Sequence, residues 1–483
     1  MPKPIKKPLA AGKKLAPDAQ RKKLKGKKYV FTSAQNNTYV HEGFFAALQS
    51  YCKDNGAELI VSRFTYNKSG FQNSTKEDTN DLWYDPKIAP YVRDVPLEVT
   101  KGLIFGGELD ILPTAENPLS GFDNYFRSAS GIIPHAKVAM KSQAGLKADG
   151  ARFLYTTGAV TLRNYIQRKA GQKAEFHHVF GALVVEVDAD GDFFVRQLTG
   201  NSKGSFQDLT NKYNPDGTVE RNQTVEALNP GDIHIEKKDE AVHEATFGKG
   251  GMLDVLKPKK VFIHDLFDFA ARNHHNIKNP HFLAEQHFID TSTVEDGIDK
   301  AAEFLSSIER PSSEVVVVES NHDKAYSRWL READPRVDPV NAEFFHRSNA
   351  KIYNELAKKN DKFHVFEWAV REKAELKRTK FLMEDDSYLV CKEHGGIECG
   401  QHGHLGPNGS RGTPQNLKNL GRKINTGHTH SAGIIAGVYT AGVSAKLDMG
   451  YNKGASSWSH SHIVTYPNGK RTIVTLKNGK WRA

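Results

Sequence analysis

Cysteine is scarce in this sequence, with three residues in 483: Cys52, Cys391 and Cys399. A small and odd number cannot build a disulfide framework and is typical of proteins that stay in a reducing cytoplasm. The sequence therefore predicts a cytoplasmic protein, located in the host cytoplasm if a virus encodes it.

Long apolar runs are absent as well. No stretch approaches 18 consecutive apolar residues, and the N-terminus lacks the apolar core of a secretion signal, so neither a membrane span nor a membrane partner is predicted. The composition is that of a globular protein, with 38% hydrophobic and 26% charged residues. A chain of this length can form two or three domains, each with its own core.

Acidic residues are nearly missing from the first 28 positions. This segment holds 11 Lys or Arg residues and one acid, Asp18, while the remaining 56 basic and 56 acidic residues cancel, so the net charge of +10 belongs to this tail. A segment so charged and so interrupted by proline cannot bury a core, and residues 1–28 are predicted to be a disordered basic tail. Two interpretations stand side by side: an arm that attracts nucleic acid through its phosphates, or a solvated tail that aids solubility.

The sequence after the tail predicts an α/β fold. Residues 27–35 have the pattern of a strand, 41–56 of an amphipathic helix and 57–66 of a second strand, which makes a β-α-β unit. The loop 33–37 after the first strand is either a ligand site or an ordinary Asn-rich loop. Residues 182–198 are a predicted hairpin, because the DADGD at its centre favours a turn.

A polar stretch at 211–223 suggests a domain boundary. We expect a separate N-terminal α/β domain of unknown role at 29–225 and a second domain at 226–450. A C-terminal β segment at 451–483 is expected to complete or extend the second domain.

Side chains that can bind metals come in pairs and triplets in the second half of the chain. In a strand, residues i and i+2 point to the same side, so a D-x-H pair or the two histidines of GHTH can serve one site. Most of these clusters follow an apolar run, and we expect them to open onto the same edge of a sheet. In chain order they are Asp232 and His234; Asp265 and Asp268; Asn321, His322 and Asp323; His402 and His404; His428 and His430.

The ordered series D-x-H, D-x-x-D, N-H-D, H-G-H and G-H-x-H resembles the five-block signature of the calcineurin-like metallophosphoesterases. The resemblance covers about residues 226–450. It implies a catalytic domain built as a two-sheet sandwich flanked by helices, with two metal ions at the strand ends. The ligands that it implies are Asp232, His234 and His430 for one ion, Asn321, His402 and His428 for the other, and Asp265 as the bridge between them.

The implied ligands are carboxylates, imidazoles and an amide, with no thiolate. This set suits a borderline or hard divalent ion, and we expect two Mn²⁺ ions, with Fe²⁺, Zn²⁺ and Mg²⁺ as alternatives. The resemblance further implies that His322 stabilises the transition state or protonates the leaving oxygen, and that Asp323 orients its ring. His264 and Ser320 stand where the family usually has glycine before the second and third blocks, which leaves specificity more open than metal binding.

A different metal site competes for part of this region. The spacing C-x₂-H-x₄-C-x₂-H is compatible with a small zinc site that would take His402 away from the cluster. The polar segment 271–282, ARNHHNIKNPHF, either lines a substrate entrance or is an ordinary loop. The residues of the competing zinc site are Cys391, His394, Cys399 and His402.

The implied two-metal centre does not by itself indicate which phosphoester is the substrate. The basic tail, the large N-terminal region and a C-terminal segment with interleaved Lys, Arg, Trp and Tyr favour nucleic acid, although the aromatic residues also fit an ordinary hairpin turned by PNG. The organisation, with blocks such as HGHLGPNGSRGTP, is similar to that of phage-encoded DNA nucleases, which are related in their catalytic part to double-strand-break-repair exonucleases.

The sequence therefore predicts a metal-dependent deoxyribonuclease with DNA as its partner, and it leaves open whether a phage encodes it. A phosphomonoesterase or small-nucleotide phosphodiesterase is the first alternative, and a non-catalytic DNA-binding component is the second. Exonuclease or endonuclease action, the physiological metal and the formation of a homo-oligomer stay open.

Overall fold

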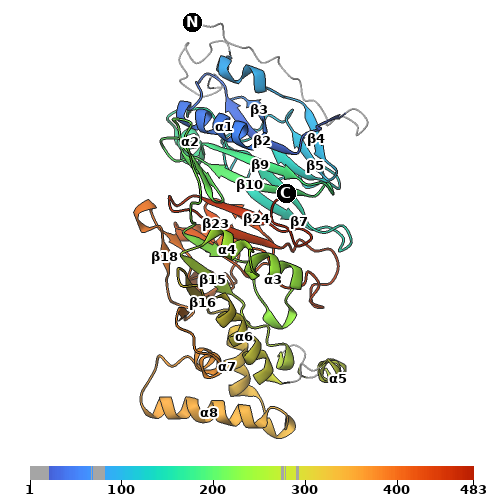
Figure 1. The fold of residues 1–483 in the computed structure, drawn as a ribbon, viewed down its shortest axis with the longest axis vertical. Helices are drawn as coiled ribbons and strands as arrows, with labels where there is room; N and C mark the ends of the chain where they lie inside the picture. The colour runs from blue at the N-terminus through green and yellow to red at the C-terminus, as the bar shows by residue number, and fades with distance from the viewer. Residues whose placement is uncertain (1–20, 67, 69–81, 274–276, 278, 290–292) are drawn as a thin grey trace.

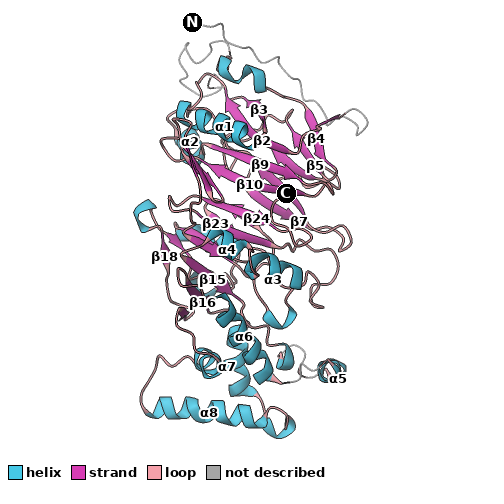
Figure 2. Cartoon of the chain, in the orientation of Figure 1, coloured by secondary structure: helices cyan, strands magenta, loops and turns pink. Residues whose placement is uncertain are grey.

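The computed structural model describes residues 21–66, 68, 82–273, 277, 279–289 and 293–483. The fold is mixed α/β, as the sequence predicted, and the described strands form four sheets (Figure 2). The sheets lie on the side of the molecule that carries the C-terminus, and helices α6 (Val294–Ile308), α7 (Asp323–Glu332) and α8 (Ala342–Ala357) lie at the opposite end (Figure 1). Within the described residues, no helix combines the length and apolar character needed to cross a bilayer.

A four-stranded sheet in the order β10-β9-β2-β3 contains both the β-α-β unit and the hairpin that the sequence predicted. β2 and β3 are parallel, and β9 and β10 are antiparallel. The helix between β2 and β3 ends at Asn55 and is capped by Gly56, whose φ of 61° is a left-handed conformation that favours glycine. The elements are β2 (Lys28–Gln35), α1 (Glu42–Asn55), β3 (Glu58–Phe64), β9 (Gly181–Val187) and β10 (Phe193–Thr199).

An 11-stranded sheet joins the two halves of the chain. β7 pairs with β21, so strand hydrogen bonds run from the region before residue 225 into the region after it. At one edge β1 pairs with β4, so Lys22 and Lys23, which lie within the tail 1–28 predicted to be disordered, belong to a strand, while residues 1–20 lie outside the described residues. The strands, in order across the sheet, are β1 (Lys22–Lys23), β4 (Pro96–Thr100), β5 (Leu103–Gly106), β6 (Ser130–Ile133), β8 (Arg152–Thr156), β7 (Met140–Gln143), β21 (Gly433–Ile435), β22 (Val438–Thr440), β20 (Lys423–Thr426), β19 (Ile397–Glu398) and β18 (Leu389–Val390).

The stretch expected to be a boundary is itself part of a small sheet. β12 pairs with both β11 and β13 in antiparallel fashion, so the polar residues at 211–223 belong to ordered hairpins. The three strands are β11 (Phe206–Asp208), β12 (Asn211–Tyr213) and β13 (Val219–Glu220).

A six-stranded sheet carries most of the predicted site. β14, β15, β16 and β17 are parallel, and the C-terminal hairpin of β23 and β24 extends the sheet by pairing with β14. Its order is β17 (Thr379–Leu382), β16 (Glu314–Val318), β15 (Lys260–His264), β14 (Ala227–Asn229), β23 (Ser461–Thr465) and β24 (Arg471–Thr475).

Both faces of this six-stranded sheet are covered. Ile263 and Val317 pack on one face against helices α6, α7 and α9, whereas Phe262 and Val316 pack on the other against β18 and β19 of the 11-stranded sheet. The two sheets therefore sandwich a core that is flanked by helices. The remaining α-helices of the described residues are α2 (Lys169–His177), α3 (Glu240–Phe247), α4 (Met252–Leu256), α5 (Pro280–Phe288), α6 (Val294–Ile308), α7 (Asp323–Glu332), α8 (Ala342–Ala357), α9 (Val365–Lys373) and α10 (Pro414–Leu417).

Candidate metal centre

Four of the predicted ligands converge on one buried point. Asp232 and His234 follow β14, Asp265 follows β15 and His430 follows β20. One potential ligand atom from each side chain lies within 4.8 Å of the others. Because β14 and β15 are parallel neighbours, their carboxyl ends meet at the same edge of the sheet, as the sequence analysis expected.

The paired side chains reach this point from turns and not from strands, so the strand interpretation of D-x-H and GHTH was wrong. β14 ends at Asn229 and β20 ends at Thr426, before either pair begins. Positive φ angles, which are uncommon outside glycine, turn the backbone inward at the site and persist only where the surroundings impose them, often at functional sites. These angles are 42° at His234, 45° at Asp265, 72° at His428 and 54° at His430.

The distances within the cluster fit a bound cation. His234 Nε2 lies 3.0 Å from His430 Nε2 and 3.4 Å from Asp265 Oδ2, and His430 Nε2 lies 3.2 Å from Asp232 Oδ2. The Oδ1 atoms of Asp232 and Asp265 are buried and have no hydrogen-bond partner among the described residues. Facing imidazole nitrogens beside unpartnered carboxylate oxygens are the donor set that a divalent ion takes up.

The second predicted set of ligands is brought together only in part. His402 Nε2 lies 3.3 Å from Asp265 Oδ2, so Asp265 stands between His234 and His402, where a bridging ligand belongs. The ring of His428 lies 5.2 Å from that of His402. Asn321 is exposed in the loop between β16 and α7, and its role as a ligand stays a prediction.

His322 stands beside the cluster, and its partner is Asp268, the second aspartate of the D-x-x-D block, to which the sequence analysis gave no role beside His322. His322 Nδ1 lies 3.1 Å from the backbone oxygen of Asp268 and 3.7 Å from its Oδ1, and Asp268 Oδ1 also lies 3.0 Å from His234 Nδ1. The orienting role expected of Asp323 is therefore wrong. The carboxylate of Asp323 instead accepts from the backbone N–H of Phe267 and from the hydroxyl of Ser320, which locks the start of α7 to the loop after β15.

Two further residues beside the centre were missed. Lys237 Nζ lies 2.9 Å from Asp268 Oδ2, and the ring of Trp458 lies 4.3 Å from that of His430. The D-x-x-D spacing already contained the signal for Asp268. Nothing in the local sequence pointed to Lys237 or Trp458, because neither lies in a block of ligand-type residues.

The buried carboxylates draw positive charge into the centre. Burial lowers the pKa of His234, and it lowers that of His428 to about 4. For His430, burial is outweighed by Asp232 and Asp265, which raise its pKa to about 9. The space between the two carboxylates is therefore the most favourable place in the cluster for a cation.

One relative was found by comparison with known proteins. Protein A1 of Escherichia phage T5 is 47% identical to the chain over an aligned length of 488 residues. The aligned region covers 99% of the chain and 86% of that protein. The chain belongs to the family of this phage protein A1. No protein-family model and no solved structure matches it.

The comparison with protein A1 supports a phage source, a point that the sequence left open. Together with the geometry, it shows a member of a phage protein family whose buried Asp and His cluster can hold a metal ion.

The competing zinc site does not form in this A1-family chain. Among the described residues, each group of three or more potential ligands surrounds Asp265 or Asp268 and contains no cysteine. Cys399 is buried, with its Sγ 3.8 Å from the backbone oxygen of Ile397, and His394 is exposed. His402 is thus left to the cluster around Asp265.

The other candidate segments have structural roles or fall outside the described residues. In the loop 33–37, Asn36 is buried and its Oδ1 accepts from the backbone N–H of Tyr66, so this loop is structural. In the segment 271–282, residues 274–276 and 278 lie outside the described residues, and His281 is exposed on α5.

Ser320 and His264, the two residues that replace family glycines, are both buried. Ser320 pairs with Asp323 at the start of α7, where its hydroxyl accepts from the backbone N–H of Asp323. The ring of His264 lies 5.6 Å from that of His402, and burial lowers the pKa of His264 to about 4.

Gly427 leaves room for the carboxylate of Asp232, which gives a prediction for this A1-family member. A Cβ at Gly427 would lie 2.0 Å from Asp232 Oδ1, and Asp232 Oδ2 accepts from the backbone N–H of His428. Gly427→Ala is expected to displace Asp232 and weaken metal binding by about 10- to 100-fold, the scale of disturbing a ligand's support. Calorimetric titration with Mn²⁺ measures the change.

The matched control for this prediction is Gly433→Ala. A Cβ at Gly433 would meet the backbone oxygen of Met140 at an ordinary 3.4 Å, so metal affinity should stay at the wild-type value. Equal affinities in Gly427→Ala and wild type would show that Asp232 is not a ligand.

Proposed function

We propose that the protein is a metal-dependent nuclease that hydrolyses phosphodiester bonds in DNA with two divalent ions, preferably Mn²⁺. The observation that carries the proposal is the convergence of Asp and His side chains from separate segments on one buried point, with carboxylate oxygens left unpartnered. If the cluster were only structural, these buried carboxylate oxygens would lack hydrogen-bond partners, which is energetically unfavourable.

We assign metal binding to the cluster of Asp and His side chains and proton transfer to His322. When bound, the ions supply an activated water and neutralise charge on the phosphoryl oxygens. Asp232, His234, Asp265 and His430 hold one edge of the centre, and His402 and His428 flank Asp265 on the other side.

His322 is suited to move a proton at the edge of the centre. Its side chain keeps 19% of its surface exposed, while the backbone oxygen of Asp268 holds Nδ1. Nε2 is therefore the nitrogen left to give a proton to a leaving oxygen, or to contact the phosphate.

The charge of the chain supports DNA as the substrate. The excess of +10 lies in the first 28 residues, and an arm of this kind gathers phosphates in a salt-dependent manner. Within this segment, β1 (Lys22–Lys23) pairs with the edge of the 11-stranded sheet and attaches the arm there.

The experiment that tests the proposal is a metal add-back assay. Protein stripped with EDTA is given Mn²⁺, Mg²⁺ or Zn²⁺ singly, with linear duplex DNA, circular duplex DNA or para-nitrophenyl phosphate esters. We expect DNA to be degraded with Mn²⁺ and left intact without metal. Turnover of the small esters with both DNAs intact would assign the protein to the phosphatase or nucleotide-phosphodiesterase alternative, and DNA binding without hydrolysis under any metal would assign it to the non-catalytic one.

A further inference from the structure

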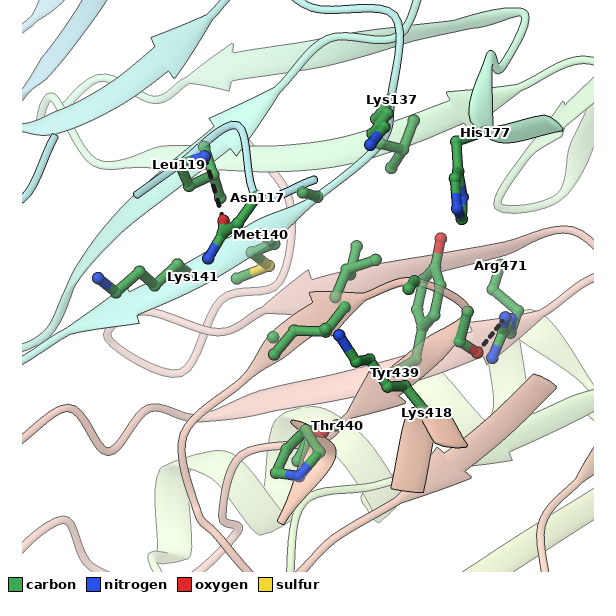
Figure 3. A pocket seen from close by; sticks show the side chains of 18 of the residues that line it. Asn117, Leu119, Lys137, Met140, Lys141, His177, Lys418, Tyr439, Thr440 and Arg471 are labelled. Atoms are coloured by element: carbon green, nitrogen blue, oxygen red, sulfur yellow. Dashed lines mark hydrogen bonds between the residues drawn. The ribbon is translucent and has the colours of Figure 1, made fainter. Parts of the chain in front are cut away.

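A second feature of the fold lies away from the carboxylates of the metal centre. A cavity of about 740 Å³ opens where the 11-stranded sheet passes from β7 to β21 and β22. Residues of α2 and of the turn between β23 and β24 also line it. Figure 3 shows Met140 and Lys141 on one side of this space, Tyr439 and Arg471 on the other, and Lys137 and His177 above.

The lining of this cavity is strongly cationic. Six lysines and Arg471 line it, and three of the lysines have carboxylate partners: Lys173 and Lys418 pair with the exposed Glu116, and Lys141 pairs with Asp123. The ammonium group of Lys137 donates to the backbone oxygen of Ala115, and that of Lys423 to the backbone oxygen of His394. Neither carbonyl neutralises a charge, and the charged groups that act on Lys470 are Lys423, Arg163 and Arg471, all of them cations.

The cations of the cavity also disfavour one another. Burial and then the charge of Lys423 lower the pKa of Lys470, burial and Arg471 lower that of Lys423, and burial and Lys173 lower that of Lys137. Like charges gathered in a partly buried space are costly unless an anion shares it.

The remaining lining is apolar with a few polar side chains. Val138, Phe176 and Ile435 keep part of their side chains exposed and offer a surface for a flat, weakly polar group, and Asn117 adds an amide. Arg471 is already held in place, with its guanidinium 3.9 Å from the centre of the Tyr439 ring and Nη1 donating to the backbone oxygen of Ile424. The cavity thus combines fixed positive charge with an apolar wall.

We propose that this cavity binds a single nucleotide, with its phosphate between Lys423 and Lys470 and its base against the apolar wall. The volume lies within the range of small-molecule sites and suits one nucleotide. Thr429, the residue between His428 and His430, also lines the cavity, so a bound nucleotide would touch the reverse side of the segment that carries two predicted metal ligands.

Binding to metal-free protein tests this site independently of the proposed nuclease. With EDTA present, calorimetric titrations use a deoxynucleoside monophosphate, the corresponding nucleoside, inorganic phosphate and a short single-stranded oligonucleotide. We expect the monophosphate to bind at least about tenfold more tightly than phosphate or nucleoside alone, because it uses both parts of the cavity. No binding of the monophosphate, or equal binding of inorganic phosphate, would overturn the proposal.

Variants locate the binding in the cavity. Lys470→Met and, separately, Lys423→Met are expected to weaken binding of the monophosphate by about tenfold, the scale of one charged contact. Lys377→Met is the control, because Lys377 is exposed and pairs with Glu375 outside the cavity lining. Unchanged affinity in both cavity variants would contradict the assignment, as would tight binding of the oligonucleotide with none of the monophosphate, which would make the cavity a path for a nucleic-acid strand.

Discussion

Asp265→Asn is expected to lower metal-dependent DNA hydrolysis by at least about 100-fold, the scale of losing one main electrostatic element of an active site. Asp265 Oδ2 lies 3.4 Å from His234 Nε2 and 3.3 Å from His402 Nε2, so one carboxylate serves both halves of the centre. Asparagine keeps its shape but removes the negative charge that attracts the ions. Initial rates of linear DNA degradation at saturating Mn²⁺, together with the Mn²⁺ dissociation constant, measure the effect.

The control for Asp265→Asn is Asp216→Asn. Asp216 is exposed in a turn and accepts from Thr218, so its replacement should leave the rate unchanged. Wild-type rates in Asp265→Asn would place the reaction elsewhere in the molecule.

His322→Ala is expected to lower the rate by about 10²- to 10⁴-fold while Mn²⁺ binding stays at the wild-type level, because general acid catalysis contributes on this scale. The rate and Mn²⁺ binding are expected to respond differently because the ring lies beside the cluster and is held by the backbone oxygen of Asp268. Single-turnover rates and a Mn²⁺ titration of the same preparation measure the two quantities.

Two companion variants sharpen this test. His346→Ala removes an exposed histidine of α8 and should change neither quantity. Asp268→Asn keeps the backbone oxygen that holds His322 but alters the carboxylate near His234, so the rate should fall less than in His322→Ala. Loss of metal binding in His322→Ala would make this residue a ligand and contradict the proton-transfer role.

The sequence predicted which segments carry the site residues better than it predicted the backbone conformation at those residues. Apolar runs such as EVVVV mark buried parallel strands, and the polar residues after β15 and β16 do reach one edge of the sheet. The left-handed turns at His234 and His428 could not be predicted, because their positive φ depends on packing with distant segments. The contact between His428 and Asp232 is of this kind, since it joins residues 196 positions apart.

Long-range strand pairing was the other limit. The interpretation of 29–225 as a separate domain relied on local composition, whereas β7 and β21 pair across almost 300 residues of chain. A local sequence pattern does not identify the strand with which a segment pairs, because each strand's sequence fits either an edge or an interior position of a sheet. The sequence analysis expected Asp323 beside His322, whereas the structure places Asp268 there. Both carboxylates lie near the centre, and only the direction of each side chain separates their roles.

The most direct test of the central claim is a crystal structure of protein soaked in Mn²⁺, with anomalous scattering used to locate the ions. We expect two peaks next to Asp265, one toward Asp232, His234 and His430, and the other toward His402 and His428. No anomalous peak beside Asp265, or a single peak between Cys391 and Cys399, would contradict the proposed centre and the nuclease function built on it.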